Sequence, residues 1–425
     1  MARAVEPATT ASRAFRHRLT ADARRVLLAR ACRGFADGLA SVVLPAYLGL
    51  LGLTAGRIGA IATFTLVGSA IATMATAFLG DRWSRRHVLL GASVVMVGTG
   101  LGFAVADTFW LLAVVAVIGT LNPSAGDVSV FLPTEQSLLP QTVPDRDRTA
   151  LFARYALAGS LLGAVGSLAA GVPERLVEAD VVSDLTAMRW VFVAYASVGV
   201  VTLVVYRGLT PAVEPPPAER RGLGSSRPIV LRLSALFSLD SFAGGFTVQT
   251  MIALWLFLRF DLSIAVTGVV FFWTGLLTAA SMLLSPVVAA RVGLIRTMVF
   301  THLPANVFLV SAALMPNATT AIVCLSLRAL LSTMDVPART SYVMAVVAAE
   351  HRQAAAAVTN VPRSLASAAG PVLAGAMLAR STFGWPLIVA GSLKICYDLM
   401  LLRAFGSIRP PEEEERIFTA KRNDH

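Results

Sequence analysis

Charged residues are scarce in this chain. Of its 425 residues only 14% are Asp, Glu, Lys or Arg, whereas a soluble globular domain carries about 25%. Hydrophobic residues make up 56% of the sequence, and the mean hydropathy is +0.70. This composition excludes a disordered chain and an ordinary soluble enzyme, and it predicts a polytopic, all-helical membrane protein.

Lysine is almost absent, because only Lys394 and Lys421 stand among 36 basic residues. The net charge of +11 would suggest a nucleic-acid partner in a soluble protein. Here most of the basic residues fall in the loops between apolar segments, which is where a membrane protein carries them. We therefore expect a lipid bilayer around the chain and no nucleic acid.

Cysteine and histidine are also rare. The three cysteines lie inside apolar segments, so no disulfide framework is expected. The five histidines are scattered without the spacing of metal ligands. No Gly-x-x-x-x-Gly-Lys-Ser/Thr run, which would bind ATP phosphates, is present. We expect no enzyme activity, no cofactor, no metal and, because residues 1–25 lack an apolar stretch, no cleavable signal peptide.

Long apolar runs dominate the sequence. A helix needs about 20 apolar residues to cross a bilayer, and twelve segments qualify. They lie near residues 26–50, 58–80, 87–106, 108–140, 149–171, 186–206, 229–257, 263–289, 295–315, 317–347, 353–379 and 383–403.

Basic residues in the loops predict the orientation. If the N-terminus is cytoplasmic, the cytoplasmic loops and tails hold 23 Lys and Arg and the opposite loops five, as the positive-inside rule requires. Both termini are then cytoplasmic, and we expect the inner membrane of a bacterium and a monomer. The predicted parts are an N-terminal tail (1–25), two six-helix bundles (26–207 and 228–403), a Pro-rich linker (208–227) and a C-terminal tail (404–425).

The two halves of the chain repeat one another weakly. Offsets of 204 to 209 residues align Gly59 with Gly268 and Pro133 with Pro337, in the same order along the chain. Two parallel repeats imply bundles related by a pseudo-twofold axis along the membrane normal, with a central site between them.

The loop after the second segment reads AFLGDRWSRR, from Ala77 to Arg86. It resembles the signature of the major facilitator superfamily, and Asp81, Arg82, Arg85 and Arg86 match its charged positions. The resemblance implies the twelve-helix, two-bundle fold of a secondary transporter, in which this loop is a latch for the outward-facing state. The alternative is that the arginines only keep the loop in the cytoplasm.

Charged residues inside the apolar segments are the candidates for a transport pathway. Each would cost about 2.5–3.5 kcal/mol or more against lipid, so we expect them in the interior. In the family, helices one, four, seven and ten line the path. The candidates for substrate or proton handling are Arg33, Asp37, Asp127, Glu135, Asp240, Asp335 and Arg339.

Asp37 is the first candidate for carrying a proton, since it lies near the middle of its segment and desolvation favours the protonated form of a carboxyl group. Arg33, one turn earlier, can pair with it. The alternative is a permanently ionised, salt-bridged Asp37. On helix twelve, Lys394 and Asp398 are spaced to pair with each other.

The repeat offsets place Arg33 opposite Asp240 and Glu135 opposite Arg339. We hypothesise that these charges pair across the pathway and exchange as the halves rock. The alternative is that each pairs within its own half.

The leading prediction is a proton-coupled secondary transporter that moves a small organic solute by alternating access, with efflux slightly favoured. Proton-coupled uptake of a charged metabolite is the first alternative. A membrane sensor on a transporter scaffold is the second.

Overall fold

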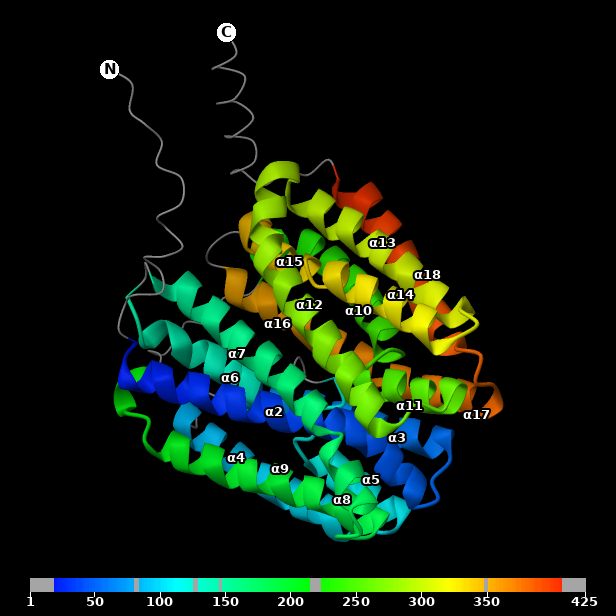
Figure 1. Ribbon diagram of the computed structural model, residues 1–425. Coiled ribbons are helices and arrows are strands. Elements are labelled where there is room, and N and C mark those ends of the chain that lie inside the picture. The colour runs from blue at the N-terminus through cyan, green and yellow to red at the C-terminus, as the bar shows by residue number, and fades with distance from the viewer. Residues whose placement is uncertain are drawn as a thin grey trace, which may run out of the picture.

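The computed structural model describes residues 19–79, 84–124, 129–144, 147–214, 223–347 and 351–406, and within them the chain is helical with no strand. Helices α2 to α9 lie together in the lower part of Figure 1, and α10 to α18 occupy the upper and right part. Of the first group, α3 lies beside α17 and α11.

The helices of the first half are α2 (Ala21–Leu50), α3 (Ala55–Leu79), α4 (Arg85–Val105), α5 (Phe109–Ile118), α6 (Phe131–Leu138), α7 (Arg148–Ala169), α8 (Val172–Glu178) and α9 (Asp184–Arg207). Those of the second half are α10 (Arg227–Gly245), α11 (Gln249–Phe260), α12 (Ile264–Val292), α13 (Leu294–Leu314), α14 (Ala318–Ser332), α15 (Asp335–Val346), α16 (Arg352–Ala368), α17 (Gly370–Arg380) and α18 (Trp385–Phe405).

Nine helical stretches of the described residues are long and apolar enough to cross a membrane. Large apolar side chains also stand outward from the bundle, such as Trp110 at 75% exposure and Phe300 at 61%. Such exposure would be costly in water and is favourable in a hydrocarbon layer. The chain is therefore a multi-pass membrane protein.

Four of the predicted segments are interrupted in the structure. Segment 108–140 divides into α5 and α6, which lie twelve residues apart, and segment 317–347 into α14 and α15. Segments 229–257 and 353–379 break after Gly245 and before Gly370-Pro371. Glycine weakens a helix and proline cannot donate the next backbone hydrogen bond, so these residues account for the last two breaks.

Glycines allow α2 and α7 to pack with their backbones almost in contact. A methyl group at Gly38 would lie 2.0 Å from the Gly163 carbonyl oxygen, and one at Gly166 would lie 2.0 Å from that of Phe35. Glycine is the residue that permits such an approach. The stripe of glycines in segment 149–171 therefore positions α2, which carries Arg33 and Asp37.

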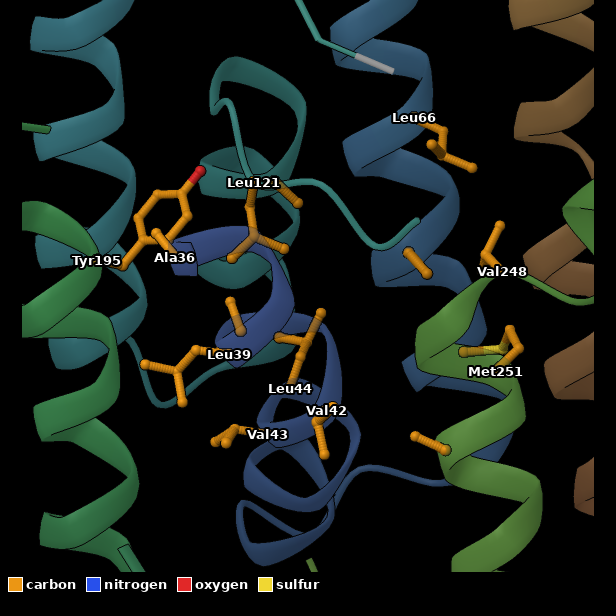
Figure 2. Close-up of a cluster of buried hydrophobic side chains, with 14 of the residues drawn as sticks. Ala36, Leu39, Val42, Val43, Leu44, Leu66, Leu121, Tyr195, Val248 and Met251 are labelled. Atoms are coloured by element: carbon orange, nitrogen blue, oxygen red, sulfur yellow. The ribbon is translucent and has the colours of Figure 1, made fainter. Parts of the chain in front are cut away.

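The two ends of the molecule differ in how the halves meet. We call the end at which α2 and α4 begin the basic end, and the end at which α2 stops and α3 begins the sealed end. One buried core runs through both halves, from α2 to α11, α13 and α17 (Figure 2 shows its part around Leu44, Leu66, Val248 and Met251). A second buried core consists of second-half residues alone, among them Phe237, Met298, Tyr342 and Phe405.

Candidate functional site

Backbone contacts join the halves at the sealed end. A methyl group at Gly59 of α3 would lie 2.3 Å from the Pro371 carbonyl oxygen, and one at Gly268 of α12 would lie 2.4 Å from that of Ser167. The Thr250 hydroxyl of α11 donates to the Ser41 carbonyl of α2 at 3.1 Å. Close backbone packing and interhelical hydrogen bonds stabilise helix contacts in membranes, so these contacts hold the two halves together at this end.

A buried group in the first half, here called the first-half cluster, consists of Arg33, Phe131, Glu135, Tyr155 and Tyr206. Arg33 Nη1 lies 3.0 Å from Glu135 Oε1, and Arg33 Nη2 lies 2.5 Å from Glu135 Oε2. The Arg33 guanidinium also stacks 4.1 Å from the Phe131 ring centroid. The forked guanidinium matches the carboxylate, which is the geometry of a strong ion pair.

Two tyrosines complete the hydrogen bonding of the Glu135 carboxylate. Tyr206 donates to Oε1 at 2.6 Å and Tyr155 donates to Oε2 at 2.6 Å. Glu135 is fully buried and Arg33 is 3% exposed. A buried pair with its hydrogen bonds satisfied is expensive to break, because either partner alone would remain as an uncompensated charge.

Asp37 lies one turn beyond Arg33 on α2 and is 6% exposed. It lies within electrostatic reach of Arg33 and Arg30. In the part of the chain that the structure describes, however, its carboxylate makes no hydrogen bond or ion pair, since Arg33 is turned toward Glu135. The pairing of Arg33 with Asp37 that the spacing allows is therefore not formed.

The second half has its own buried group, the second-half cluster, made of Asp240, His302, Asp335, Arg339, Lys394 and Asp398. Its centre is Asp240 of α10, whose Oδ1 lies 2.6 Å from Lys394 Nζ and whose Oδ2 lies 3.2 Å from Arg339 Nη1. Arg339 Nη2 also lies 3.2 Å from Asp335 Oδ2.

Asp398 contacts two polar side chains of α13. His302 Nδ1 lies 2.8 Å from Asp398 Oδ1, and Asn306 Nδ2 donates to Asp398 Oδ2 at 3.0 Å. Sequence reasoning missed His302 and Asn306, although two polar residues one turn apart inside an apolar helix were a usable signal.

The structure corrects three pairings expected from the sequence. Arg33 pairs with Glu135, and Asp240 pairs with Arg339, each within its own half, so the predicted pairs across the pathway are absent among the described residues. Lys394 reaches Asp240 and not Asp398. The helices of each half pack so that every one of these charges finds its partner within that half, whereas the repeat offsets had suggested partners in the opposite half.

Two further basic residues near helix starts differ in exposure. Arg30 of α2 is 7% exposed and lies over the Tyr155 ring. Arg232 of α10 is exposed. Asp81, Arg82 and Asp127 lie outside the described residues.

The described part of the signature loop contacts its own half. The backbone amides of Arg85 and Arg86 donate to the Glu214 carboxylate at 2.9 and 3.0 Å. Arg86 Nη2 donates to the Arg207 carbonyl at 2.7 Å. A carboxylate is stabilised at a helix N-terminus by the partial positive charge there, so Glu214 ties the start of the linker to α4.

The sequence is similar to that of a yeast membrane protein. The chain is 25% identical over 405 residues to an uncharacterized membrane protein of Saccharomyces cerevisiae, with 87% of this chain and 90% of that protein covered.

Two transporter structures share the fold. A bacterial homologue of the human lysosomal transporter Spinster, inward-facing and occupied, superposes with a TM-score of 0.69 at 16% identity, over 91% of this chain and 97% of that one. The nucleoside transporter NupG superposes with a TM-score of 0.68 at 13% identity, over 90% and 99%.

The family model of the Major Facilitator Superfamily matches residues 26–334. Together with the helical fold, this shows that the chain belongs to the major facilitator superfamily.

Proposed function

We propose that the protein is a proton-coupled secondary transporter that moves a small organic solute by alternating access. The observation that carries the proposal is that the buried carboxylate of Asp37 has no partner among the described residues. The other buried carboxylates, Asp22, Glu135, Asp240, Asp335 and Asp398, each have an ionic or hydrogen-bonded partner, whereas Asp37 has none among the described residues. A buried carboxyl group without a partner gains most from taking up a proton.

Separate cores support a rocking motion. One core crosses between the halves and includes the sealed end, while the second-half core at the basic end contains no first-half residue among those described. We propose that this structure is the state open toward the basic end, and that twelve spans form two six-helix bundles related by a pseudo-twofold axis. The basic end is then cytoplasmic, as the charge count predicts.

The partners and location follow from the same proposal. The protein works as a monomer in a lipid bilayer, with both termini in the cytoplasm and a proton as the coupling ion. Efflux is the proposed direction, and the resemblance of the signature loop to that of the superfamily is its support. Uptake of a charged metabolite remains the alternative. A similar sequence also occurs in yeast.

Proteoliposomes with an imposed pH gradient test the proposal. Wild-type protein accumulates or expels a solute from a panel of small organic compounds when the gradient is present, and Asp37→Asn abolishes this driven flux. Solute exchange at equal pH on both sides moves no net proton, so it survives in Asp37→Asn.

Asp261→Asn is the matched control. Asp261 is exposed and has a left-handed backbone (φ 52°), which asparagine adopts readily. The Asp261→Asn substitution removes one negative charge, as Asp37→Asn does, but at an exposed position outside the buried site. We therefore expect this variant to retain the driven flux. If Asp37→Asn still responds to the pH gradient as wild type does, Asp37 is not the proton carrier.

A further inference from the structure

Two arginines in the middle of the second half have no carboxylate partner in the part of the chain that the structure describes. Arg363 of α16 donates from Nε to Ser241 Oγ at 3.1 Å and from Nη1 to Asn360 Oδ1 at 3.4 Å, and both acceptors are neutral. Arg328 of α14 makes no hydrogen bond or ion pair within the described residues, and its buried Nε is without an acceptor.

Both side chains point into the bundle. At 3.6 residues per turn, Arg328 lies on the face of α14 that carries the buried Ala321 and Leu325, away from the exposed Val323 and Leu327. Arg363 follows Ala355 and Thr359 at intervals of four residues, and both of these are buried. Both guanidiniums lie close enough to Asp240 for their charges to be attracted by it.

Charge is therefore unbalanced at this depth. Four basic side chains, Arg328, Arg339, Arg363 and Lys394, lie near three carboxylates, those of Asp240, Asp335 and Asp398. Asp240 already binds Lys394 and Arg339, and Asp335 binds Arg339. An uncompensated guanidinium in the middle of a membrane protein is costly, so a further anion would stabilise it.

We infer that the solute carries an oxyanion, a carboxylate or a phosphate ester, which binds at the guanidinium groups of Arg328 and Arg363. The planar fork of a guanidinium matches either group. Arg328 lies ten residues from the start of α14, about 15 Å along its axis. A lipid phosphate at the membrane surface does not reach that depth, so the ligand is a water-soluble solute. This assignment rests on the proposed transport function and names the substrate class.

Four probes that share a benzene ring test the inference by binding. They are benzoate, phenyl phosphate, benzylammonium and benzyl alcohol, at millimolar concentration with purified protein in detergent. The melting temperature of wild-type protein rises with benzoate or phenyl phosphate, and which of the two acts distinguishes a carboxylate site from a phosphate site. Benzylammonium and benzyl alcohol leave it unchanged.

The variants Arg328→Gln and Arg363→Gln lose at least tenfold in oxyanion affinity. Arg232→Gln removes an equal charge from an exposed position on α10 and keeps wild-type affinity. Arg363→Lys retains the positive charge but not the planar fork of the guanidinium, so its oxyanion affinity lies between that of wild type and that of Arg363→Gln. Without probe, neither glutamine variant melts below wild type, because each removes an unbalanced charge.

Three results overturn the inference: no stabilisation by either oxyanion, equal stabilisation by the cationic or neutral probe, or wild-type affinity in both glutamine variants. The assay uses no gradient and no bilayer. A protein that binds the oxyanion but shows no proton-driven flux would therefore refute the proposed function and leave the site standing.

Discussion

The buried ion pairs of this protein form inside each half, and the choice of partner was not readable from the sequence. Composition and spacing identified Arg33, Glu135 and Asp240 as interior residues, and the structure buries all three. Their partners depend on how each helix is rotated about its axis, which a repeat offset does not fix. An i,i+4 pair is worth only about 0.5 kcal/mol, so that spacing does not bind Lys394 to Asp398, and Lys394 pairs with Asp240 of α10 instead.

Glu135→Gln tests the first-half cluster. It leaves Arg33 buried without a counter-charge, and we expect a loss of about 3–5 kcal/mol in stability. Thermal unfolding in detergent should show a markedly lower melting temperature. The double variant Arg33→Gln with Glu135→Gln should recover part of the loss, because the orphan charge is removed. Equal melting of wild type and Glu135→Gln would mean that the pair does not hold the first half together.

Helices were predicted more reliably than their interruptions. Apolar length located most of the spans, and their bounds agree within a few residues for α4, α9, α13 and α18. A window of hydropathy does not register a local break, so the division of segments 108–140 and 317–347 was not foreseen. Gly245 and Gly370-Pro371 were visible signals for the other two breaks. The contact between α3 and α17 could not be predicted, because it depends on which end of the pathway is closed.

Gly59→Val tests that contact. Its side chain would meet the Pro371 carbonyl and Gly375 Cα, and overpacking of this kind costs about 1–3 kcal/mol. We expect the sealed state to be depleted about tenfold, with a matching fall in disulfide crosslinking between Thr54→Cys and Thr382→Cys.

Gly56→Val, almost one turn earlier on α3, is the control, because a methyl group there meets nothing within 4 Å. It should crosslink as wild type does. Undiminished crosslinking in Gly59→Val would show that the glycine does not set the approach of α3 and α17.

At the scale of the whole molecule, the sequence predicted a membrane carrier of the major facilitator superfamily, and the family assignment is confirmed. The signature loop, the twelve apolar segments and the repeat of the two halves carried that prediction. Which end is sealed is a property of one conformation, so no sequence pattern reports it. The two proposals place their chemistry in different halves: the proposed proton site is Asp37 in the first half, and the proposed oxyanion site is at Arg328 and Arg363 in the second.

Paired spin labels measure the central claim, alternating access, most directly. The background replaces Cys32, Cys324 and Cys396 with serine, and labels stand at Thr54 with Thr382 for the sealed end and at His87 with Arg296 for the basic end. All four label positions are exposed. On addition of a transported solute, the sealed-end distance should lengthen in part of the population while the basic-end distance shortens. Two distances that stay fixed, or that change in the same direction, would contradict a carrier that opens one end as it closes the other.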